Sequence, residues 1–364
     1  RRGARHEKDD ESRSGVAFRG GDEMGIEHTG MPLDGDAERR FGQESSAEIR
    51  ERSATSMTPA DLFDGLDLYP FTKFVWHSQK AKDEWEERVQ RARRLHDRVE
   101  FEMVARGYRR AATLHLSPQY FEYQVEQIHK AGLVWLPIQR TRNYSGFSHR
   151  HFPTTGNDPN SSVYGVLART IEDAEEFRRA SSYMTATPTD HETIGELLGF
   201  PSCCRAFFTE VWPTFFDPMW QAAERTAGAK LVRERTLEVR GSYLNVQLLR
   251  YAGFRVTSHL TCRLDCEASK EIGRIWEQVG FDIDPEGARA LKEILTMPIR
   301  WSVLHGIAQV ETPIFTVVTN SLPTKQKWEI LFLADESDGR HDPLIQIGDR
   351  LVKARSMMEN NARG

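Results

Sequence analysis

The chain is organised around one stretch, Gly199-Phe200-Pro201-Ser202-Cys203-Cys204-Arg205-Ala206-Phe207-Phe208. Pro201 has a fixed φ and Ser202 is a good N-cap, so a helix is predicted to begin here. The apolar spacing that follows indicates a buried helical face formed by Phe207, Phe208, Val211 and Phe215. Cys203 and Cys204 therefore lie in the first helical turn. There, unpaired amide groups and the positive end of the helix dipole favour the thiolate, the form that binds metals and attacks electrophiles.

The remaining cysteines, Cys262 and Cys266, form a second group in the stretch His259-Leu260-Thr261-Cys262-Arg263-Leu264-Asp265-Cys266. All four cysteines thus fall into two groups, as expected for a site built from two chain segments. If the second group opens a helix that continues through Trp276, the four-residue spacing places both sulfurs on one face. His259 would then precede that helix, with a ring nitrogen in reach of the thiols.

Adjacent cysteines are unusual for zinc, because four-thiolate zinc sites generally use pairs spaced Cys-x-x-Cys. Neighbouring side chains in a helix diverge by about 100°, so aiming Cys203 and Cys204 at one small ion is expected to need a distorted backbone. An iron–sulfur cluster relaxes this demand, because different sulfurs can bind different irons. If only one of the pair is a ligand, a three-thiolate site keeps an open metal position for substrate. We therefore predict a metal centre at Cys203, Cys204, Cys262 and Cys266, with an iron–sulfur cluster as the first hypothesis and zinc as the alternative.

Two alternatives need no metal. Cys203 or Cys204 can act as a redox thiol or nucleophile, in which case Cys204 is the expected catalytic thiol. The cysteines can also be inert buried residues, as free cysteines often are. The polar neighbours of the second group, Arg263, Asp265 and Glu267, argue against inert cysteines there.

Arginines near the two cysteine groups are candidates for holding an anion, because the guanidinium keeps its charge and offers a planar fork of donors. We expect Arg250 and Arg255 to orient an anionic group of the substrate. Arg205 and Arg263 are further candidates, although each such arginine is more often a surface ion-pair partner.

Two histidines complete the set of candidate residues. His259 shares a segment with two thiols and is expected to be a metal ligand or a general acid or base. His305, next to Gly306 after an apolar run, is expected to be a proton shuttle or a ligand, with a hydrogen-bonded core histidine as the alternative.

Charge and composition limit the function classes. A formal net charge of −5 gives no general case for nucleic acid or an anionic membrane surface as partner. No apolar run approaches the roughly 20 residues that span a bilayer, and no signal-peptide core follows Arg1-Arg2. Four cysteines in 364 residues argue for a reducing compartment. We expect a cytoplasmic protein with a small-molecule substrate; the composition identifies no protein partner.

The domain organisation follows from local composition. Residues 1–56 are polar, with few aromatic or β-branched residues, and are predicted to be disordered. We expect a helical or α+β region over 57–160, a cysteine-containing α/β domain over 161–335 and a polar tail over 336–364. The predicted fold class is α/β, with α+β as the alternative: one helix-rich core with a small mixed sheet.

Hydrophobic periodicity and capping residues place most of the elements. Helices are predicted at 78–106, 117–132, 171–180, 191–198, 243–251 and 285–295, and a helix from Cys203 is expected to be interrupted at Pro213 or Pro218. Strands are predicted at 133–138, 163–167, 254–257, 307–311, 314–319 and 328–333.

The motif Gly199 to Phe208, preceded by the predicted helix that begins Ile171-Glu172-Asp173, resembles an uncharacterised prokaryotic domain family. Its members carry a Gly-(Tyr/Phe)-Pro-x-Cys-Cys-x-x-Phe motif. Three later stretches, Leu249 to Arg255, His259-x-x-Cys262-x-x-x-Cys266 and Pro298 to Gly306, are similar to the same pattern. The resemblance covers roughly residues 160 to 315 and implies a shared site without specifying a reaction.

Together these observations predict a cytoplasmic metal-dependent enzyme that acts on a small anionic molecule. The second hypothesis is a non-catalytic protein in which zinc ties two helix starts together. The third is a metal-free thiol redox or sulfur-transfer enzyme.

Overall fold

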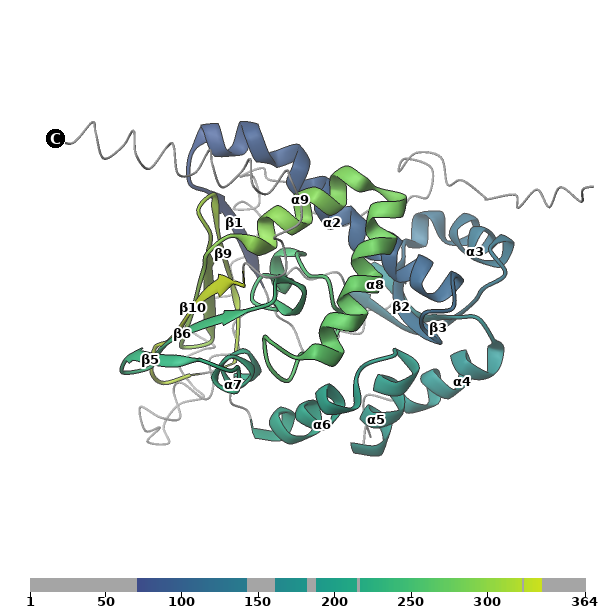
Figure 1. Ribbon diagram of the computed structural model, residues 1–364. Coiled ribbons are helices and arrows are strands. Elements are labelled where there is room, and N and C mark those ends of the chain that lie inside the picture. Colours follow the sequence, from purple (N-terminus) through teal and green to yellow (C-terminus); the bar gives the residue numbers. More distant parts are fainter. Residues whose placement is uncertain (1–70, 143–160, 182–187, 215–216, 323, 336–364) are drawn as a thin grey trace, which may run out of the picture.

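The computed structural model describes residues 71–142, 161–181, 188–214, 217–322 and 324–335 (Figure 1). The tails predicted at 1–56 and 336–364 lie outside these residues. The described part confirms the α/β fold class: a mixed sheet lies on one side of the molecule, a smaller sheet on the other, and helices cover and connect them (Figure 1).

The larger sheet has seven strands. They are β1 (Thr72–Trp76), β5 (Lys230–Arg233), β6 (Thr236–Gly241), β7 (Ile299–Leu304), β8 (Ile307–Glu311), β9 (Phe315–Asn320) and β10 (Trp328–Ala334). Their order is β1-β9-β8-β7-β10-β6-β5, with β10 and β6 parallel and every other pair antiparallel. The sheet is mixed, as predicted, but larger than expected, because the periodicity revealed only β8, β9 and β10.

The smaller sheet is antiparallel, in the order β2-β4-β3. Its strands are β2 (Ala111–Leu116), β3 (Val134–Arg142) and β4 (Ser161–Ala168). β3 is longer than the predicted strand at 133–138, and β2 was not predicted. Because β4 pairs with both β2 and β3, and β1 pairs with β9, the expected boundary at residue 160 does not separate two sheets.

Eight α-helices lie in the part of the chain that the structure describes. They are α2 (Gln79–Ala105), α3 (Phe121–Lys130), α4 (Ile171–Ala180), α5 (Pro188–Leu197), α6 (Ser202–Val211), α7 (Pro218–Glu224), α8 (Glu267–Ile283) and α9 (Pro285–Thr296). The long helix α2 begins where Ser78 caps the amide of Ala81 at 3.1 Å. It ends before Gly107, whose φ of +77° suits glycine. Both ends agree with the prediction.

One main hydrophobic core lies between the larger sheet and the helices α2, α8 and α9. Its most deeply buried large side chains include Leu95, Phe254, Trp276, Trp301 and Phe315. Two smaller clusters lie against the smaller sheet, one around Leu116 and Trp135 and the other around Phe177 and Leu197. The helices α4, α5 and α6 follow one another along the lower edge of the molecule and carry the chain to the first cysteine pair (Figure 1).

The predicted helix at 243–251 and the predicted strand at 254–257 are wrong. The structure has two 3₁₀ turns, η4 (Tyr243–Asn245) and η5 (Arg250–Ala252), and no strand at 254–257. The amide side chains of Asn245 and Gln247 hydrogen-bond to backbone carbonyls of the later segment 257–266, so they hold neighbouring loops together. The apolar side chains whose spacing indicated one helical face instead pack within a compact segment that forms neither an α-helix nor a strand.

No helix among the described residues combines the length and apolarity that crossing a bilayer requires.

Asp217 links the start of α7 to Ser321, near the end of strand β9, through its buried side chain. Its side chain is only 1% exposed; Oδ1 accepts the amide of Met219 at 2.8 Å and Oδ2 accepts the Ser321 hydroxyl at 3.1 Å. Burial raises the pKa of its carboxyl from 3.8 to about 6. Between about pH 4 and pH 6 the folded chain therefore holds a proton on Asp217 that the unfolded chain has already lost.

The Asp217→Asn variant tests this group. Since the folded pKa is raised, wild-type stability is lost as pH rises between the two pKa values, by at most about 3 kcal/mol. The difference in unfolding free energy, wild type minus variant, is expected to fall as pH rises from about 4 to about 7. Urea unfolding at matched pH values measures it, and a pH-independent difference would contradict the buried-acid assignment.

Candidate metal centre and adjoining cavities

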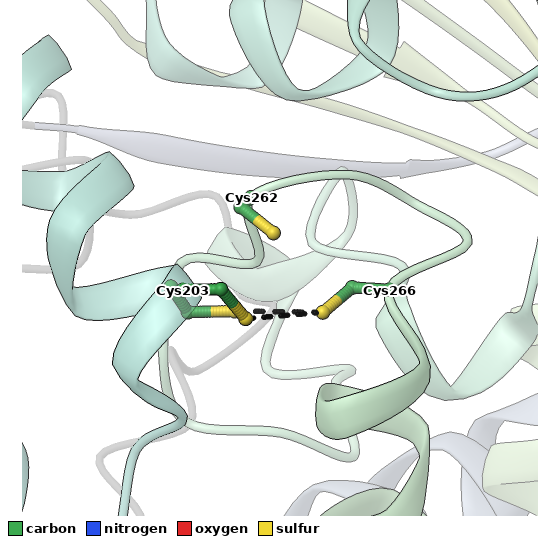
Figure 2. A group of neighbouring side chains, drawn as sticks. Cys203, Cys262 and Cys266 are labelled. Atoms are coloured by element: carbon green, nitrogen blue, oxygen red, sulfur yellow. Dashed lines mark hydrogen bonds between the residues drawn. The ribbon is translucent and has the colours of Figure 1, made fainter.

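The four cysteine sulfurs meet in one place. Cys203 and Cys204 belong to α6. Cys266 directly precedes α8, and Cys262 lies in the loop that leads to Cys266 (Figure 2). The Sγ atom of Cys203 lies 4.0 Å from that of Cys204 and 3.7 Å from that of Cys266, and Cys204 Sγ lies 3.8 Å from Cys266 Sγ. All four sulfurs lie within 4.8 Å of one another, an arrangement that can hold a metal ion. The prediction that two distant segments form one thiol group is confirmed.

Both helix starts face this group. The N-cap of α6 is Pro201, and Ser202 is the first helical residue, so the predicted Ser202 cap is wrong by one position. Cys266 occupies the N-cap position of α8. The first amides of each helix have no intrahelical partner, and their partial positive charge stabilises thiolates. Two helix termini thus favour negative charge on the same sulfurs.

Two geometric expectations are wrong. Cys262 and Cys266 do not share a helical face, because α8 begins only at Glu267 and Cys262 lies in the preceding loop. Cys203 and Cys204 also bring their sulfurs together although α6 is a regular helix. In a first turn no earlier turn restricts the side-chain rotamers, so two neighbouring sulfurs can swing toward one point.

The thiols cannot all ionise without a cation among them. Cys204 is in hydrogen-bond contact with the sulfurs of Cys262 and Cys266, and these contacts raise the pKa of the Cys204 thiol well above its ordinary value. The same contacts lower the pKa of Cys266, whose sulfur accepts hydrogen bonds from Cys204 and Cys262. Repulsion between additional thiolates would have to be offset by a positive ion, and closely gathered thiolates are the preferred ligands of zinc and iron.

The loop that carries Cys262 is held by buried polar contacts. The Asn245 side chain donates to the carbonyl of Cys266 at 3.0 Å and, more weakly, to that of Leu264 at 3.4 Å. The Ser242 amide donates to the Leu264 carbonyl at 2.9 Å, and Thr226 Oγ1 accepts the Leu264 amide at 2.9 Å. Sequence reasoning missed Asn245; a polar residue within the apolar run 243–249 was the available signal.

A cavity of about 260 Å³ adjoins the buried Cys204. We call it the thiol cavity. Its lining is mostly apolar and aromatic and includes Ile194, Phe200, Phe208, Trp212, Met219, Tyr251 and Leu260. The polar and charged side chains in the wall are His191, Cys204, Arg205, Arg250, Ser258 and His259.

A second cavity of about 420 Å³ shares part of that wall. We call it the arginine cavity, because both Arg250 and Arg255 line it. Its other polar side chains include His96, Asp97, Glu100, His115 and Tyr164. The residues common to both cavities are His191, Ile194, Phe200, Arg250 and Ser258.

His259 is buried in the wall of the thiol cavity. Its Nε2 atom lies 2.9 Å from Ser269 Oγ, and its Nδ1 atom has no hydrogen-bond partner in the described part of the chain. Burial, followed by the charge of Arg109, lowers the pKa of this imidazole to about 3, so the ring is neutral at pH 7. Within the described residues the metal-competent group consists of the cysteines alone, so the structure does not add His259 to the ligands.

Arg250 and Arg255 lie together, as expected for a pair that recognises an anion. The Arg255 side chain reaches the Arg250 carbonyl at 3.4 Å and His96 Nδ1 at 3.5 Å, and its Nε atom has no hydrogen-bond partner among the described residues. Within the same residues neither arginine forms an ion pair with a carboxylate, although the charges of Asp97 and Glu100 still act on Arg255. Burial, reinforced by the charge of Arg250, lowers the pKa of Arg255 to about 10.

Three other candidates lie elsewhere or have partners. Arg205 donates to Glu192 at 2.7 Å and to the Phe200 carbonyl at 2.6 Å, so it ties α6 to α5. Arg263 is exposed beside Asp265. His305 is exposed in the tight turn between β7 and β8, with φ of +51°, and lines neither cavity. A two-residue hairpin turn explains its position after the apolar run, and its expected role as a proton shuttle or ligand stays a prediction.

A buried ion pair escaped the sequence reasoning. Glu100 on α2 binds Arg109, and its Oε1 atom accepts the Trp276 indole N–H at 2.9 Å. The Arg109 charge lowers the pKa of the Glu100 carboxyl against the opposing effect of burial. The available signal was an acidic residue on the apolar face of the predicted helix at 78–106.

Gly241, the last residue of β6, tests how the cysteine loop is positioned. A Cβ there would lie 2.6 Å from the Leu264 Cβ and 2.8 Å from the Leu264 carbonyl oxygen, so the loop backbone must move. Gly241→Ala is therefore expected to weaken binding of added Zn²⁺ at least tenfold in a competition titration with a coloured chelator. The control is Gly280→Ala in α8, where a Cβ meets only ordinary contacts at 3.6 Å and beyond. Equal Zn²⁺ affinities for the two variants would contradict this account of the loop.

No protein-family model matches this chain, and neither does any curated protein or solved structure. The likeness of the cysteine motifs to an uncharacterised prokaryotic family stays a prediction. The function is therefore argued from the thiol group and the cavities themselves.

Proposed function

We propose that this chain binds one tetrahedral metal ion, Zn²⁺ in the first place, through Cys203, Cys204, Cys262 and Cys266. The ion keeps the wall of a small-molecule site in place. One observation carries the proposal: three sulfur separations of 3.7, 3.8 and 4.0 Å. A tetrahedral ion with metal–sulfur bonds of about 2.3 Å has its ligands about 3.8 Å apart.

The iron–sulfur cluster expected from the adjacent cysteines has less support. In a cluster different irons carry the thiolates, so at least some ligand sulfurs lie about 6 Å apart. Here no pair of the four sulfurs is separated by more than 4.8 Å. The argument that favoured a cluster was the divergence of Cys203 and Cys204, and their sulfurs converge.

Four thiolates fill a tetrahedral coordination sphere, which is typical of structural zinc and leaves no open position for substrate. A metal in this place would join the start of α6 to the start of α8. α6 also carries the thiol-cavity residues Cys204, Arg205 and Phe208. The proposed role of the metal is thus to hold α6 against the segment 258–260, on the opposite wall of the cavity.

The ligand of the proposed site is a small anion, as expected from Arg250 and Arg255. Support comes from two arginines, Arg250 and Arg255, that line one cavity and form no ion pair with a carboxylate of the described residues. If the site also performs a reaction, His259 is the proposed general base, because its ring is neutral and its Nδ1 atom has no hydrogen-bond partner among the described residues.

Metal analysis of the purified full chain tests the metal centre. We expect a colourless protein with about one Zn²⁺ per chain, and a Co²⁺-substituted form with the visible spectrum of tetrahedral thiolate coordination. Cys266→Ala is expected to lower Zn²⁺ affinity at least a hundredfold and to reduce thermal stability. The matched control is His305→Ala, in the exposed turn, which should retain wild-type metal content.

Other results would contradict the proposal in distinct ways. A brown protein with several irons and acid-labile sulfide per chain would restore the cluster hypothesis. A fully folded, metal-free protein whose thiols react freely with an alkylating reagent would support the thiol redox hypothesis instead.

A further inference from the structure

We propose that the thiol cavity and the arginine cavity form one binding site for a molecule that joins an aromatic ring to an oxyanion. The ring occupies the thiol cavity, and the oxyanion lies against Arg250 and Arg255. The inference rests on the small-anion site of the proposed function and adds the chemical class of the ligand.

The two cavities adjoin each other at a shared wall. Both are lined by His191, Ile194, Phe200, Arg250 and Ser258. Arg250 therefore borders a mostly apolar space on one side and a polar space on the other. Separately the cavities measure about 260 and 420 Å³, and together they reach the size range of sites that enclose small organic ligands. A ligand that uses both must have an apolar and a charged end.

The thiol cavity is suited to a flat ring. Phe208 stacks on Trp212 with ring centroids 4.8 Å apart, and His191 meets Phe208 edge to face at 5.3 Å. Trp212 remains 37% exposed, which is unusual for so large an apolar side chain next to a cavity. Aromatic rings bind preferentially in offset or edge-to-face contact with such groups. An aliphatic chain would fill the volume without using this geometry.

The arginine cavity is suited to an oxyanion. Among the described residues Arg255 makes only long hydrogen bonds, at 3.4 and 3.5 Å, and its Nε atom has no hydrogen-bond partner. His96, which is 6% exposed, lines the same cavity, and its Nδ1 atom lies 3.3 Å from Asp97 Oδ1 and 3.5 Å from an Arg255 nitrogen. A planar guanidinium binds a carboxylate or phosphate through two parallel hydrogen bonds. An anionic group would thus satisfy donors that the described residues leave unused.

The acidic groups of this cavity are already engaged. Glu100 pairs with the buried Arg109, and Asp97 lies 3.3 Å from His96 Nδ1. The charges of Asp97 and Glu100 also act on Arg255, but less strongly than burial and the charge of Arg250 do. The two arginines retain their positive charge for a ligand.

Binding of small probes to the zinc-supplemented full chain tests the inference by calorimetry. 3-Phenylpropanoate carries both ends, propanoate only the anion, and 3-phenylpropan-1-ol only the ring. We expect 3-phenylpropanoate to bind at least tenfold more tightly than either of the others. Phenyl phosphate distinguishes the two anion classes: tighter binding than 3-phenylpropanoate assigns the site to phosphates, and weaker binding assigns it to carboxylates.

Two variants separate the ends of the site. Arg255→Gln is expected to lower the affinity for 3-phenylpropanoate at least tenfold and to leave binding of the alcohol unchanged. Trp212→Ala should weaken the binding of both aromatic probes and leave the binding of propanoate unchanged. Arg274→Gln, on the exposed side of α8 in an ion pair with Glu271, serves as the control and should change nothing.

Three results would overturn the inference: propanoate binding as tightly as 3-phenylpropanoate, the alcohol binding as tightly, or Arg255→Gln without effect. If propanoate binds as tightly as 3-phenylpropanoate, the small-anion site of the proposed function still holds. Only the aromatic part of the present inference is then contradicted. Metal content measured on the same samples separates the two proposals, since a zinc-loaded protein that binds no probe contradicts this inference but not the metal centre.

Discussion

The mutual repulsion of closely gathered sulfur charges is the constraint on which this structure depends. Four cysteines from two segments lie within 4.8 Å, at the starts of two helices. Helix termini favour the charge on each sulfur, and the positive charge of Arg225 also acts on Cys262. The proposed metal ion would offset the remaining repulsion and would crosslink the starts of α6 and α8, which α7, β5, β6 and their connecting turns separate in sequence.

The proposed crosslink would join two elements next to the sulfurs, the loop before α8 and the helix α6. The loop before α8 is fixed by the Asn245 amide and by close packing on Gly241. On the other side, α6 contributes Cys203 and Cys204 to the sulfur group and Cys204, Arg205 and Phe208 to the thiol cavity. The proposed metal binding and ligand binding thus depend on the same short helix and share Cys204.

Much of the fold and most of the site could be predicted from sequence, for identifiable reasons. The helix α2 has a strong apolar stripe, a serine cap and a glycine stop, all local signals. The thiol group was predictable because cysteines are rare in this chain and cluster in two places. By contrast, His305 follows an apolar run that proved to be the hairpin strand β7, and only the three-dimensional pairing places it in a turn. The ion pair of Glu100 and Arg109 joins residues whose proximity depends on how β2 follows α2.

The parallel pair of β6 and β10 has a consequence for how this molecule is made. β10 is the last strand of the described chain, yet it lies between β7 and β6, in the interior of the larger sheet. During synthesis on the ribosome, β6 and β7 each have one edge with unpaired backbone groups until residues 328–334 have been made. Such a late, long-range insertion slows folding and exposes the nascent chain to aggregation. Chaperone contact during synthesis would protect these unpaired edges of β6 and β7.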